Sequence, residues 1–398
     1  MILKLKNLPI RLLLPKNKAA IFDDKKQLPP FSDEIITVLS QLGLFLMKEG
    51  RSEPSIVAAG YWLRKKLLLT MKSQYGEQYL SAKGAAFHIA PGNVDTLFFY
   101  SMIISVLCGN QTILRISNKL SEETQFFIHL LNTFFAKHPE FSAVQSLMNI
   151  VQYDHACLAG NEITQQLSLF ADVRVIWGGD NTVKEISKIP LKSTACNITF
   201  PDRYSVAVIQ LESEQQVEQA VNNLLTDIKP FYQQACSSPK AIYWLKTAQK
   251  LQEKFWLLLA DKLAQQVSLS STDLISRLVY LQRLPLLFVD GQQNHLSVSR
   301  YEMLQQVGVK YLPLEVIKAH CGLWILLSLQ IQCLTDIQLF EHCQTVTVSG
   351  IDKIVIQHWQ QSVKLARSQT VKRIVPAGQA LTFSHIWDGV DLINKLTS

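Results

Sequence analysis

Short apolar runs alternate with longer segments of helical spacing from residue 85 onward. Short apolar runs between turn residues are typical of buried strands, and apolar residues that recur every three or four positions are typical of helices. Strands that alternate with helices predict a parallel sheet with right-handed crossovers. In this first region we expect the strands Ala85–Ala90, Thr112–Ser117, Asn149–Tyr153 and Val173–Trp177, and the helices Val94–Cys108, Ser121–Lys137, Glu162–Phe170 and Thr182–Ile189.

A second alternating region begins at Tyr204, which predicts a boundary between two α/β units near Pro201-Asp202. Before residue 80 the spacing indicates only helices, over Phe31–Gly50 and Ile56–Lys72. The elements expected in the second region are the strands Tyr204–Gln210, Lys240–Leu245, Leu323–Leu329, Thr345–Ser349 and Lys372–Pro376, and the helices Glu212–Lys229, Ala248–Gln265 and Thr335–His342.

Composition narrows the class of protein. Hydrophobic residues make up 48% of the 398 positions and charged residues 18%, which excludes a disordered chain. The net charge of +7 suits an anionic small ligand such as a nucleotide, without the dense basic stripe of a nucleic-acid binder. No apolar run reaches the ~18–20 residues that span a bilayer, and we find no signal peptide. Seven scattered cysteines without a CxxC pair argue against a disulfide framework and a metal site, and favour a cytoplasmic protein.

Three loops that follow expected strands carry residues that could bind a ligand or take part in catalysis: Pro91-Gly92-Asn93, Ser117-Asn118-Lys119 and Gly178-Gly179-Asp180. Ligands of parallel sheets bind at the carboxyl ends of the strands. The Asn93 amide could donate to an oxyanion, and the Gly178-Gly179 turn could bring a helix N-terminus close to a phosphate. Arg115 could contact a nucleotide ribose or phosphate. Taken singly, each of these residues also fits an ordinary turn or surface position.

Cys236 lies between an expected helix and an expected strand, in a turn that contains Ser237, Ser238 and Pro239. A reactive cysteine needs partial exposure and a favourable electric field, and a loop cysteine of this kind fits that need. It also fits an ordinary half-buried cysteine. We interpret the pairs His320-Cys321 and His342-Cys343, and the strand residue His88, as structural.

The motifs APGNV, VIWGG, ACSSP and IWDG, in this order, resemble the LuxC family of long-chain fatty acyl reductases. That family is similar to the aldehyde dehydrogenase superfamily, and the resemblance extends from about Ala58 to the C-terminus. It implies an aldehyde-dehydrogenase-like α/β fold. Its expected parts are a helical N-terminal segment packed on the cofactor domain (1–80), a Rossmann-like nicotinamide-binding domain (81–203), a catalytic domain (204–370) and a C-terminal segment returning to the cofactor and oligomerisation region (371–398).

The resemblance also implies roles for the residues singled out above. Cys236 matches the family's nucleophile, which would become acylated by a thioester. Asn93 matches the amide that holds the oxyanion together with the backbone N–H of Cys236. The residues that match the cofactor site are Pro91, Gly92, Arg115, Ser117, Gly178 and Gly179. An Arg at position 115 suits the 2′-phosphate of NADPH.

One departure from the superfamily concerns the direction of the reaction. Members that oxidise aldehydes carry a Glu about 34 residues before the nucleophile, which activates the deacylating water. Here residues 197–200 read NITF, with Thr199 as the nearest match and no carboxylate before Asp202. Without that base, the acyl-enzyme should survive to accept a hydride, which favours reduction over hydrolysis.

We therefore expect NADPH-dependent reduction of a fatty acyl thioester to the aldehyde. Reduction of carrier-protein thioesters and oxidative aldehyde dehydrogenation are the alternatives, and a non-enzymatic subunit that retains the fold is a third. The expected partners are fatty acyl-CoA or an acyl-protein thioester, an acyl-protein synthetase, an acyl transferase and further copies of the chain. The apolar segments Leu68–Met71, Leu97–Ile104 and Phe255–Leu259 are candidates for an acyl tunnel, although core packing is the more ordinary interpretation of each.

Overall fold

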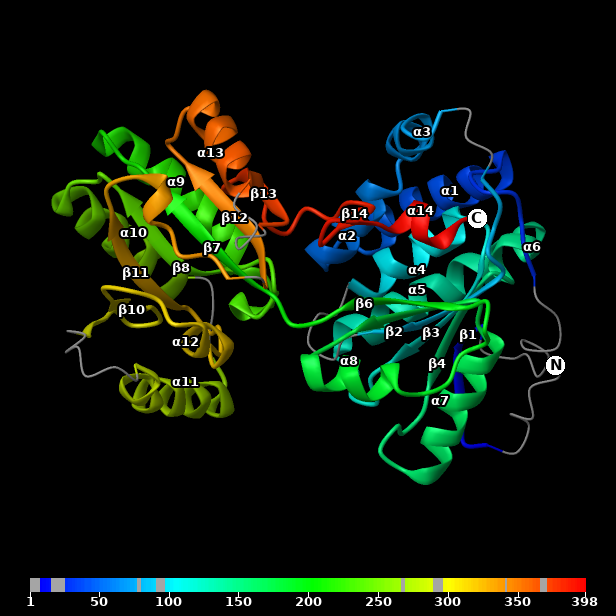
Figure 1. Ribbon diagram of the computed structural model, residues 1–398. Helices are drawn as coiled ribbons and strands as arrows, with labels where there is room; N and C mark the ends of the chain where they lie inside the picture. Colours follow the sequence, from blue (N-terminus) through cyan, green and yellow to red (C-terminus); the bar gives the residue numbers. More distant parts are fainter. Residues whose placement is uncertain are drawn as a thin grey trace. The chain divides into compact units, whose positions relative to one another are not determined.

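The computed structural model describes residues 8–15, 26–76, 80–90, 97–265, 269–288, 296–340, 342–365 and 371–398. Its contacts divide the chain into two compact units (Figure 1). The first unit contains residues 1–201 and 383–398, and the second contains residues 202–382. Residues 371–398, expected to return as one segment, are therefore divided between the two units.

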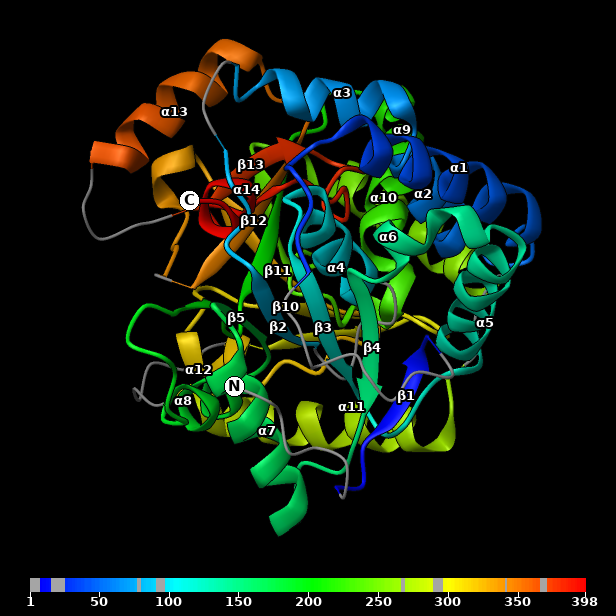
Figure 2. The same cartoon turned by 90° about the vertical axis from the view of Figure 1, so that its right-hand side faces the viewer.

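The first unit contains a six-stranded sheet with the order β1-β4-β3-β2-β5-β6. All neighbouring strands are parallel except β1, which pairs antiparallel with β4 at one edge (Figure 2). The strands are β1 (Arg11–Leu14), β2 (Ala85–Ile89), β3 (Gln111–Ile116), β4 (Met148–Gln152), β5 (Val173–Trp177) and β6 (Cys196–Phe200). The N-terminal segment was expected to be helical, and β1 corrects that expectation. Strand β6 lies in a region for which no element was expected from the sequence.

Helices cover both faces of this sheet. Residues of α1, α4 and α5 form one apolar core with it, and α7 packs on the opposite face. The helices of the unit are α1 (Asp33–Glu49), α2 (Pro54–Trp62), α3 (Lys65–Ser73), α4 (Leu97–Leu107), α5 (Glu122–Lys137), α6 (Ser142–Gln145), α7 (Leu158–Phe170), α8 (Asp180–Ser187) and α14 (Leu392–Leu396), and the hairpin β14 (Ile386–Trp387) and β15 (Val390–Asp391) precedes α14.

The helix expected over Ile56–Lys72 is broken into α2 and α3 at Leu63-Arg64. Helix α2 is also packed closely against α1. A Cβ atom at Gly43 would lie 2.8 Å from the carbonyl oxygen of Gly60, so the two helices touch through their backbones. The break after α2 then lets Leu68 of α3 be buried in the same core.

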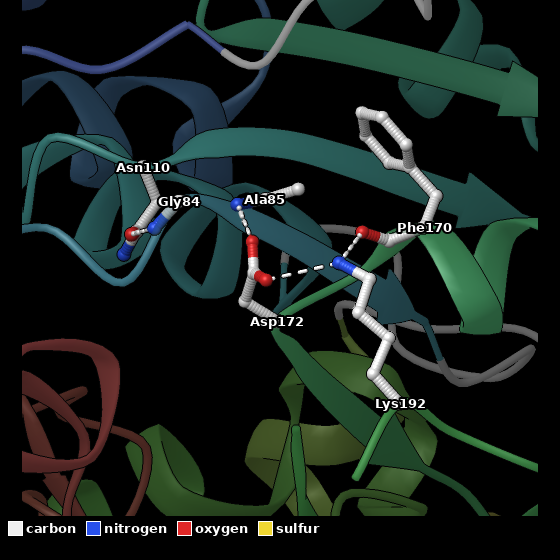
Figure 3. Close-up of polar contacts among 6 residues, drawn as sticks. All are labelled: Gly84, Ala85, Asn110, Phe170, Asp172 and Lys192. Atoms are coloured by element: carbon white, nitrogen blue, oxygen red, sulfur yellow. Dashed lines mark hydrogen bonds and ion pairs between the residues drawn. The ribbon is translucent and has the colours of Figure 1, made fainter. Parts of the chain in front are cut away.

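Polar contacts fix the amino edge of the first sheet (Figure 3). The Asp172 carboxylate, just before β5, accepts from the backbone N–H of Ala85 at 2.8 Å and forms an ion pair of 2.9 Å with Lys192. The Asn110 side chain, just before β3, accepts from the backbone N–H of Gly84 at 2.9 Å. Three segments far apart in sequence are thus held at the start of adjacent strands.

The second unit contains a seven-stranded sheet with the order β13-β12-β7-β8-β11-β10-β9, parallel except for β9. Residues of α9 and α10 cover one face, and residues of α11, α12 and α13 pack on the other. The elements are β7 (Tyr204–Ile209), α9 (Glu214–Ile228), β8 (Pro239–Leu245), α10 (Gln249–Ala264), α11 (Ser271–Arg283), β9 (Ser297–Arg300), β10 (Gln305–Gly308), α12 (Leu314–Lys318), β11 (Ile325–Ile331), β12 (Cys343–Ser349), α13 (Lys353–Leu365) and β13 (Arg373–Pro376).

The expected helix Thr335–His342 is wrong. Leu334–Asp336 form a single 3-10 turn, and residues 337–340 are not helical. In that segment Ile337 and Leu339 are buried and Gln338 between them is exposed, so its apolar period is two rather than 3.6. The alternation directs the two apolar side chains into the core shared with β7 and β12.

Candidate active site

Cys236 lies at the amino edge of the second sheet, in the turn that leads into β8. Three consecutive residues before it, Phe231, Tyr232 and Gln233, have left-handed backbones with φ of 56°, 52° and 64°. Such conformations are unfavourable for bulky residues and are found where surrounding contacts enforce them, frequently at functional sites. The turn is therefore held in a specific, strained shape.

The side chain of Gln233 is one of the contacts that enforce this shape. It is buried, and its Nε2 donates to the carbonyl oxygens of Pro239 at 2.8 Å and Ile325 at 2.9 Å. The backbone N–H of Leu323 donates to the carbonyl oxygen of Tyr232 at 2.8 Å. The segment before β11 is thus bonded directly to the segment that carries Cys236.

Two serines hold the turn from the other side. The Oγ of Ser205, in β7, donates to the carbonyl oxygen of Cys236 at 2.8 Å, and the Oγ of Ser238 donates to the carbonyl oxygen of Asp227 at 2.7 Å. Ser205 and Ser238 are fully buried, whereas Cys236 is half-buried. The arrangement fixes the backbone of Cys236 and leaves its side chain partly accessible, as a nucleophile requires.

Other cysteines of the second unit are less suited to nucleophilic chemistry. Burial raises the pKa of Cys321 to about 11, and Cys343 is fully buried with its pKa raised to about 12. Because the thiolate is the reactive form, both are poor nucleophiles near neutral pH.

The two His-Cys pairs, interpreted as structural from the sequence, lie in polar and aromatic contacts at the same sheet edge. The Nδ1 of His320 accepts from the backbone N–H of Gly322 at 3.0 Å, and its ring packs on Tyr280 with 5.0 Å between centroids. His342 forms a 2.8 Å hydrogen bond with Arg203. Sequence reasoning missed that His320-Cys321 precedes a strand next to β8, since strand order is not visible in the sequence.

Arg115 lies at the carboxyl end of β3 in the first unit, with 9% of its surface exposed. Its guanidinium forms a hydrogen bond of 2.8 Å with Nδ1 of His155 and lies 5.6 Å from the Tyr153 ring centroid. Burial lowers the pKa of Arg115, and the neighbouring Tyr153 and Asp154 act in the opposite direction. Its buried Nε has no hydrogen-bond partner within the described ranges, so the cation retains an unused donor.

The turn after Arg115 is held by Gln152 of β4. The Nε2 of Gln152 donates to the carbonyl oxygen of Ser117 at 2.8 Å, and the Oγ of Ser117 accepts from the backbone N–H of Lys119. Asn118 and Lys119 are exposed. This end of β3 therefore presents an exposed amide and an exposed ammonium near Arg115.

Gly178 and Gly179 connect β5 to α8. Gly179 is the N-cap residue and supplies no side-chain acceptor, so the first N–H groups of α8 are not capped by it. A Cβ atom at Gly178 would lie 3.2 Å from the Thr182 side chain, which makes this a tight turn. Asp180 in the first turn of α8 is exposed and adds a negative charge beside those N–H groups.

The structure brings Arg115, Ser117, Gly178 and Gly179 to the carboxyl edge of one sheet, on the strands β3 and β5 that flank β2. Pro91, Gly92 and Asn93 lie outside the described residues. Thr199 is exposed on the edge strand β6.

The segments considered for an acyl tunnel are core residues. Leu68, Met71 and the described, buried side chains of α4 belong to one core of the first unit, whereas Phe255, Trp256 and Leu259 belong to a core of the second. No helix within the described ranges is long and apolar enough to cross a membrane. Among the same residues, no three His, Cys, Asp or Glu side chains are grouped as a metal site would need.

Several solved structures to which this chain is similar are aldehyde dehydrogenases. Methylmalonate-semialdehyde dehydrogenase from Oceanimonas doudoroffii matches with a TM-score of 0.63 and 12% identity, over 91% of this chain and 80% of that one. A 3,6-anhydro-L-galactose dehydrogenase in complex with NAP matches with a TM-score of 0.60 and 11% identity, over 92% of this chain and 86% of that one. The fold is thus aldehyde-dehydrogenase-like, as expected from the sequence.

Curated relatives match part of the chain. The long-chain acyl-protein thioester reductase 2 of Photobacterium leiognathi is 27% identical over 172 residues, and the long-chain acyl-protein thioester reductase of Aliivibrio fischeri is 25% identical over 172 residues. Each match covers 43% of this chain and 34% of the relative, so the match spans about a third of the length of these proteins. The family model described as acyl-CoA reductase (LuxC) matches residues 65–274, which include Cys236 and more than half of the chain. The chain belongs to the acyl-CoA reductase (LuxC) family.

Proposed function

We propose that the protein reduces a fatty acyl thioester to the aldehyde through an acyl-cysteine formed on Cys236. The observation that carries the proposal is the geometry of this residue, a half-buried thiol on a left-handed turn whose carbonyl is anchored by Ser205. A nucleophile must be accessible and must also be held in one position, since misplacement by about 1 Å can cost ~10²-fold in rate. The Cys236 turn meets both requirements.

The reaction would begin when the Cys236 thiolate attacks the thioester carbonyl carbon. A new C–S bond forms, the bond to the donor sulfur breaks, and the donor departs as a thiolate that takes up a proton. The tetrahedral oxyanion would be held by the Cys236 backbone N–H and, as the family resemblance implies, by Asn93. Removal of one such donor typically costs about 10²–10³ in rate.

A nicotinamide cofactor, when bound, supplies the hydride that reduces the acyl-cysteine to the oxidation level of an aldehyde. The residues that would hold such a cofactor lie at the carboxyl ends of the strands in the first sheet. There the unpartnered Nε of Arg115 and the exposed Lys119 offer positive charge to a phosphate, and the uncapped N-terminus of α8 lies after Gly178-Gly179. We assign NADPH rather than NADH because Arg115 suits a 2′-phosphate.

The product should be the aldehyde rather than the acid. After reduction, the carbon–sulfur bond to Cys236 breaks, the aldehyde leaves and the thiolate is regenerated. Hydrolysis of the acyl-cysteine would need a base that activates water, and strand β6 carries Asn197 and Thr199 in the region where oxidising relatives have a Glu. The side chain of Asn197 is already hydrogen-bonded, since its Oδ1 accepts from Nε of Arg174 at 2.9 Å.

The donor is proposed to be a fatty acyl-CoA or an acylated protein, which matches the names of the curated relatives. An acyl-protein synthetase, an acyl transferase and further copies of this chain are the proposed partners.

The decisive experiment is intact-protein mass spectrometry after incubation with acyl-CoAs of several chain lengths, without cofactor. We expect an acyl adduct that is absent from Cys236→Ala and is discharged as aldehyde by NADPH. Cys333→Ala, an exposed cysteine far along the chain, is the matched control and should keep the adduct. Discharge as free acid would favour the oxidative alternative. Absence of an adduct from acyl-CoAs and from acylated carrier protein alike would overturn the proposal.

A further inference from the structure

Lys240, four residues after Cys236, occupies a β-bulge. In the pairing of β7 with β8, Ser205 lies opposite Pro239 and the next residue, Val206, lies opposite Ala241. Lys240 is therefore the extra residue on β8. Bulges disrupt the regular alternation of side chains and are over-represented next to active sites, where they re-aim a side chain.

The side chains of β8 that follow the bulge alternate regularly between the two faces of the sheet. Ile242 and Trp244 pack into the core with α9 and α10, and Ala241 and Tyr243 pack into the core on the other face. In a regular strand Lys240 would share the face of Ile242 and Trp244, and would place an ammonium in an apolar core. Lys240 is instead half-buried at the sheet edge, next in the chain to the Cys236 turn.

The titratable groups that act on Lys240 come from several segments at the amino ends of the strands of this sheet. Burial lowers the pKa of Lys240, whereas Cys236, Asp202 and Cys321 act in the opposite direction by favouring the ammonium. Burial lowers the pKa of His320 well below its usual value and Lys240 acts in the same direction, so the imidazole is neutral near pH 7. On α11, Arg277 acts to lower the pKa of Cys321. The pKa of Tyr280, which packs on His320, is raised mainly by burial and further by Cys321. Lys240 thus lies within electrostatic range of two thiols, a carboxylate and an imidazole.

We propose that Lys240 is a positioning residue for the reaction, whose ammonium keeps Cys236 in the thiolate form before attack and again when the aldehyde leaves. The inference rests on the proposed role of Cys236 as nucleophile. An ordinary cysteine is only a few per cent thiolate at pH 7, so an adjacent cation changes the amount of reactive species directly. No proton or electron beyond the Cys236 proton is involved.

The test measures the pH dependence of Cys236 alkylation by iodoacetamide, followed by peptide mass spectrometry so that the other cysteines do not contribute. We expect Lys240→Gln to raise the pH midpoint by about one unit or more, and Lys240→Arg to restore it. Each unit by which the thiol pKa rises lowers the thiolate fraction at pH 7 about tenfold and raises the nucleophilicity of the remaining thiolate about threefold. Alkylation at pH 7 should therefore slow about threefold per unit. Lys246→Gln, an exposed residue just after the far end of β8, should leave the midpoint unchanged.

A variant of opposite sign separates this effect from structural damage. Asp202→Asn removes a negative charge from the same cluster and should lower the midpoint, whereas a loosened turn would not shift the two variants in opposite directions. If Lys240→Gln does not fold, the native protein still tests the proposal. The anionic reagent iodoacetate should then react with Cys236 faster, relative to iodoacetamide, than it does with Cys333, whose thiol contacts Asp336.

A midpoint that is unchanged in folded Lys240→Gln would overturn the inference, as would equal reagent ratios at the two cysteines. Either result would leave the proposed function intact if the acyl adduct still forms on Cys236. A shifted midpoint in Lys240→Gln, in a protein whose native form acquires no acyl adduct, would instead overturn the proposed function and leave only an effect of the Lys240 charge on the Cys236 thiol.

Discussion

The Oγ of Ser205 donates to the carbonyl oxygen of Cys236 at 2.8 Å and accepts from the backbone N–H of Thr345 at 3.2 Å. One hydroxyl therefore ties β7 to both the Cys236 turn and β12. Ser205 is fully buried, so the Cys236 carbonyl and the Thr345 N–H could not form replacement hydrogen bonds with water if the hydroxyl were removed.

We expect Ser205→Ala to destabilise the protein by about 1–3 kcal/mol, because it leaves a buried carbonyl and a buried N–H unpaired. Acylation of Cys236 should slow more than the loss of folded protein explains, since the turn loses an anchor. Urea denaturation and the rate of adduct formation measure the two effects. Ser276→Ala, on the exposed face of α11, is the matched control. Equal acylation rates in the native protein and Ser205→Ala would contradict this role.

The buried carboxyl of Asp227 connects α9 to the turn after β13. It accepts from the backbone N–H groups of Gly378 at 2.7 Å and Ala380 at 2.8 Å. These bonds and Arg373 favour the ionised form, but burial outweighs them and raises the pKa to about 6. In the unfolded chain the pKa of an Asp is about 4. The folded protein therefore binds the proton more tightly between these values, and this group adds stability as the pH falls.

We expect the free energy of unfolding of the native protein to rise by roughly 2–3 kcal/mol, relative to that of Asp227→Asn, when the pH is lowered from 7 to 4. The asparagine can accept only one of the two N–H bonds and does not titrate. Urea denaturation at several pH values measures the difference between the two proteins. Parallel pH profiles would show that the Asp227 carboxyl has the same pKa in the folded and unfolded states.

The sequence predicted the buried parallel strands best. Val173–Trp177 has the expected bounds because a short apolar run between turns leaves little choice of register. The edge strand β1 could not be recognised, since its pairing with β4 joins residues that are more than 130 positions apart. The bulge at Lys240 and the left-handed backbones of Phe231 and Tyr232 likewise depend on strand register and on neighbouring segments. Site residues could therefore be named from motifs, but not the contacts that hold them.

Gly84 precedes β2 with a φ of +123°, and a Cβ atom there would collide with the Asp172 carboxylate shown in Figure 3. We expect Gly84→Ala to destabilise the protein by about 2–4 kcal/mol, from backbone strain and from displacement of Asp172 away from Ala85. Gly76→Ala is the matched control. Gly76 also has a positive φ, of +56°, but no atom lies within 4 Å of the added Cβ position. Thermal unfolding of both variants separates the collision from the strain, and equal losses would show that Asp172 does not constrain this position.

Arg115 provides a test of cofactor choice. We expect Arg115→Gln to raise the KM for NADPH at least tenfold and to leave the KM for NADH nearly unchanged, because the guanidinium is assigned to the 2′-phosphate. His155→Ala is the companion variant, since it removes the hydrogen-bond partner of Arg115 and keeps the charge. It should shift the KM for NADPH less. Steady-state rates with both cofactors decide the question, and an equal rise in both KM values would assign Arg115 to a part of the cofactor common to NADH and NADPH.

Thr199 provides the test of reaction direction. It is exposed on β6 and is the nearest match to the Glu of oxidising relatives. If the missing carboxylate is what preserves the acyl-cysteine, Thr199→Glu should hydrolyse it. The preformed adduct on Cys236 should then decay to free acid at least tenfold faster than in the native protein, within the 10²–10⁴-fold range that a positioned general base can supply.

Thr199→Gln has nearly the same size and cannot act as a base, so its adduct should decay at the native rate. The measurement is the loss of adduct mass with time, without cofactor, across pH 5 to 9. A base must be ionised to act, so the rate for Thr199→Glu should rise with pH through the pKa of the new carboxyl and then level off. If Glu and Gln variants decay alike, the lifetime of the acyl-enzyme is set elsewhere, and Asp202, the first carboxylate that follows β6 in the chain, becomes the residue to remove next.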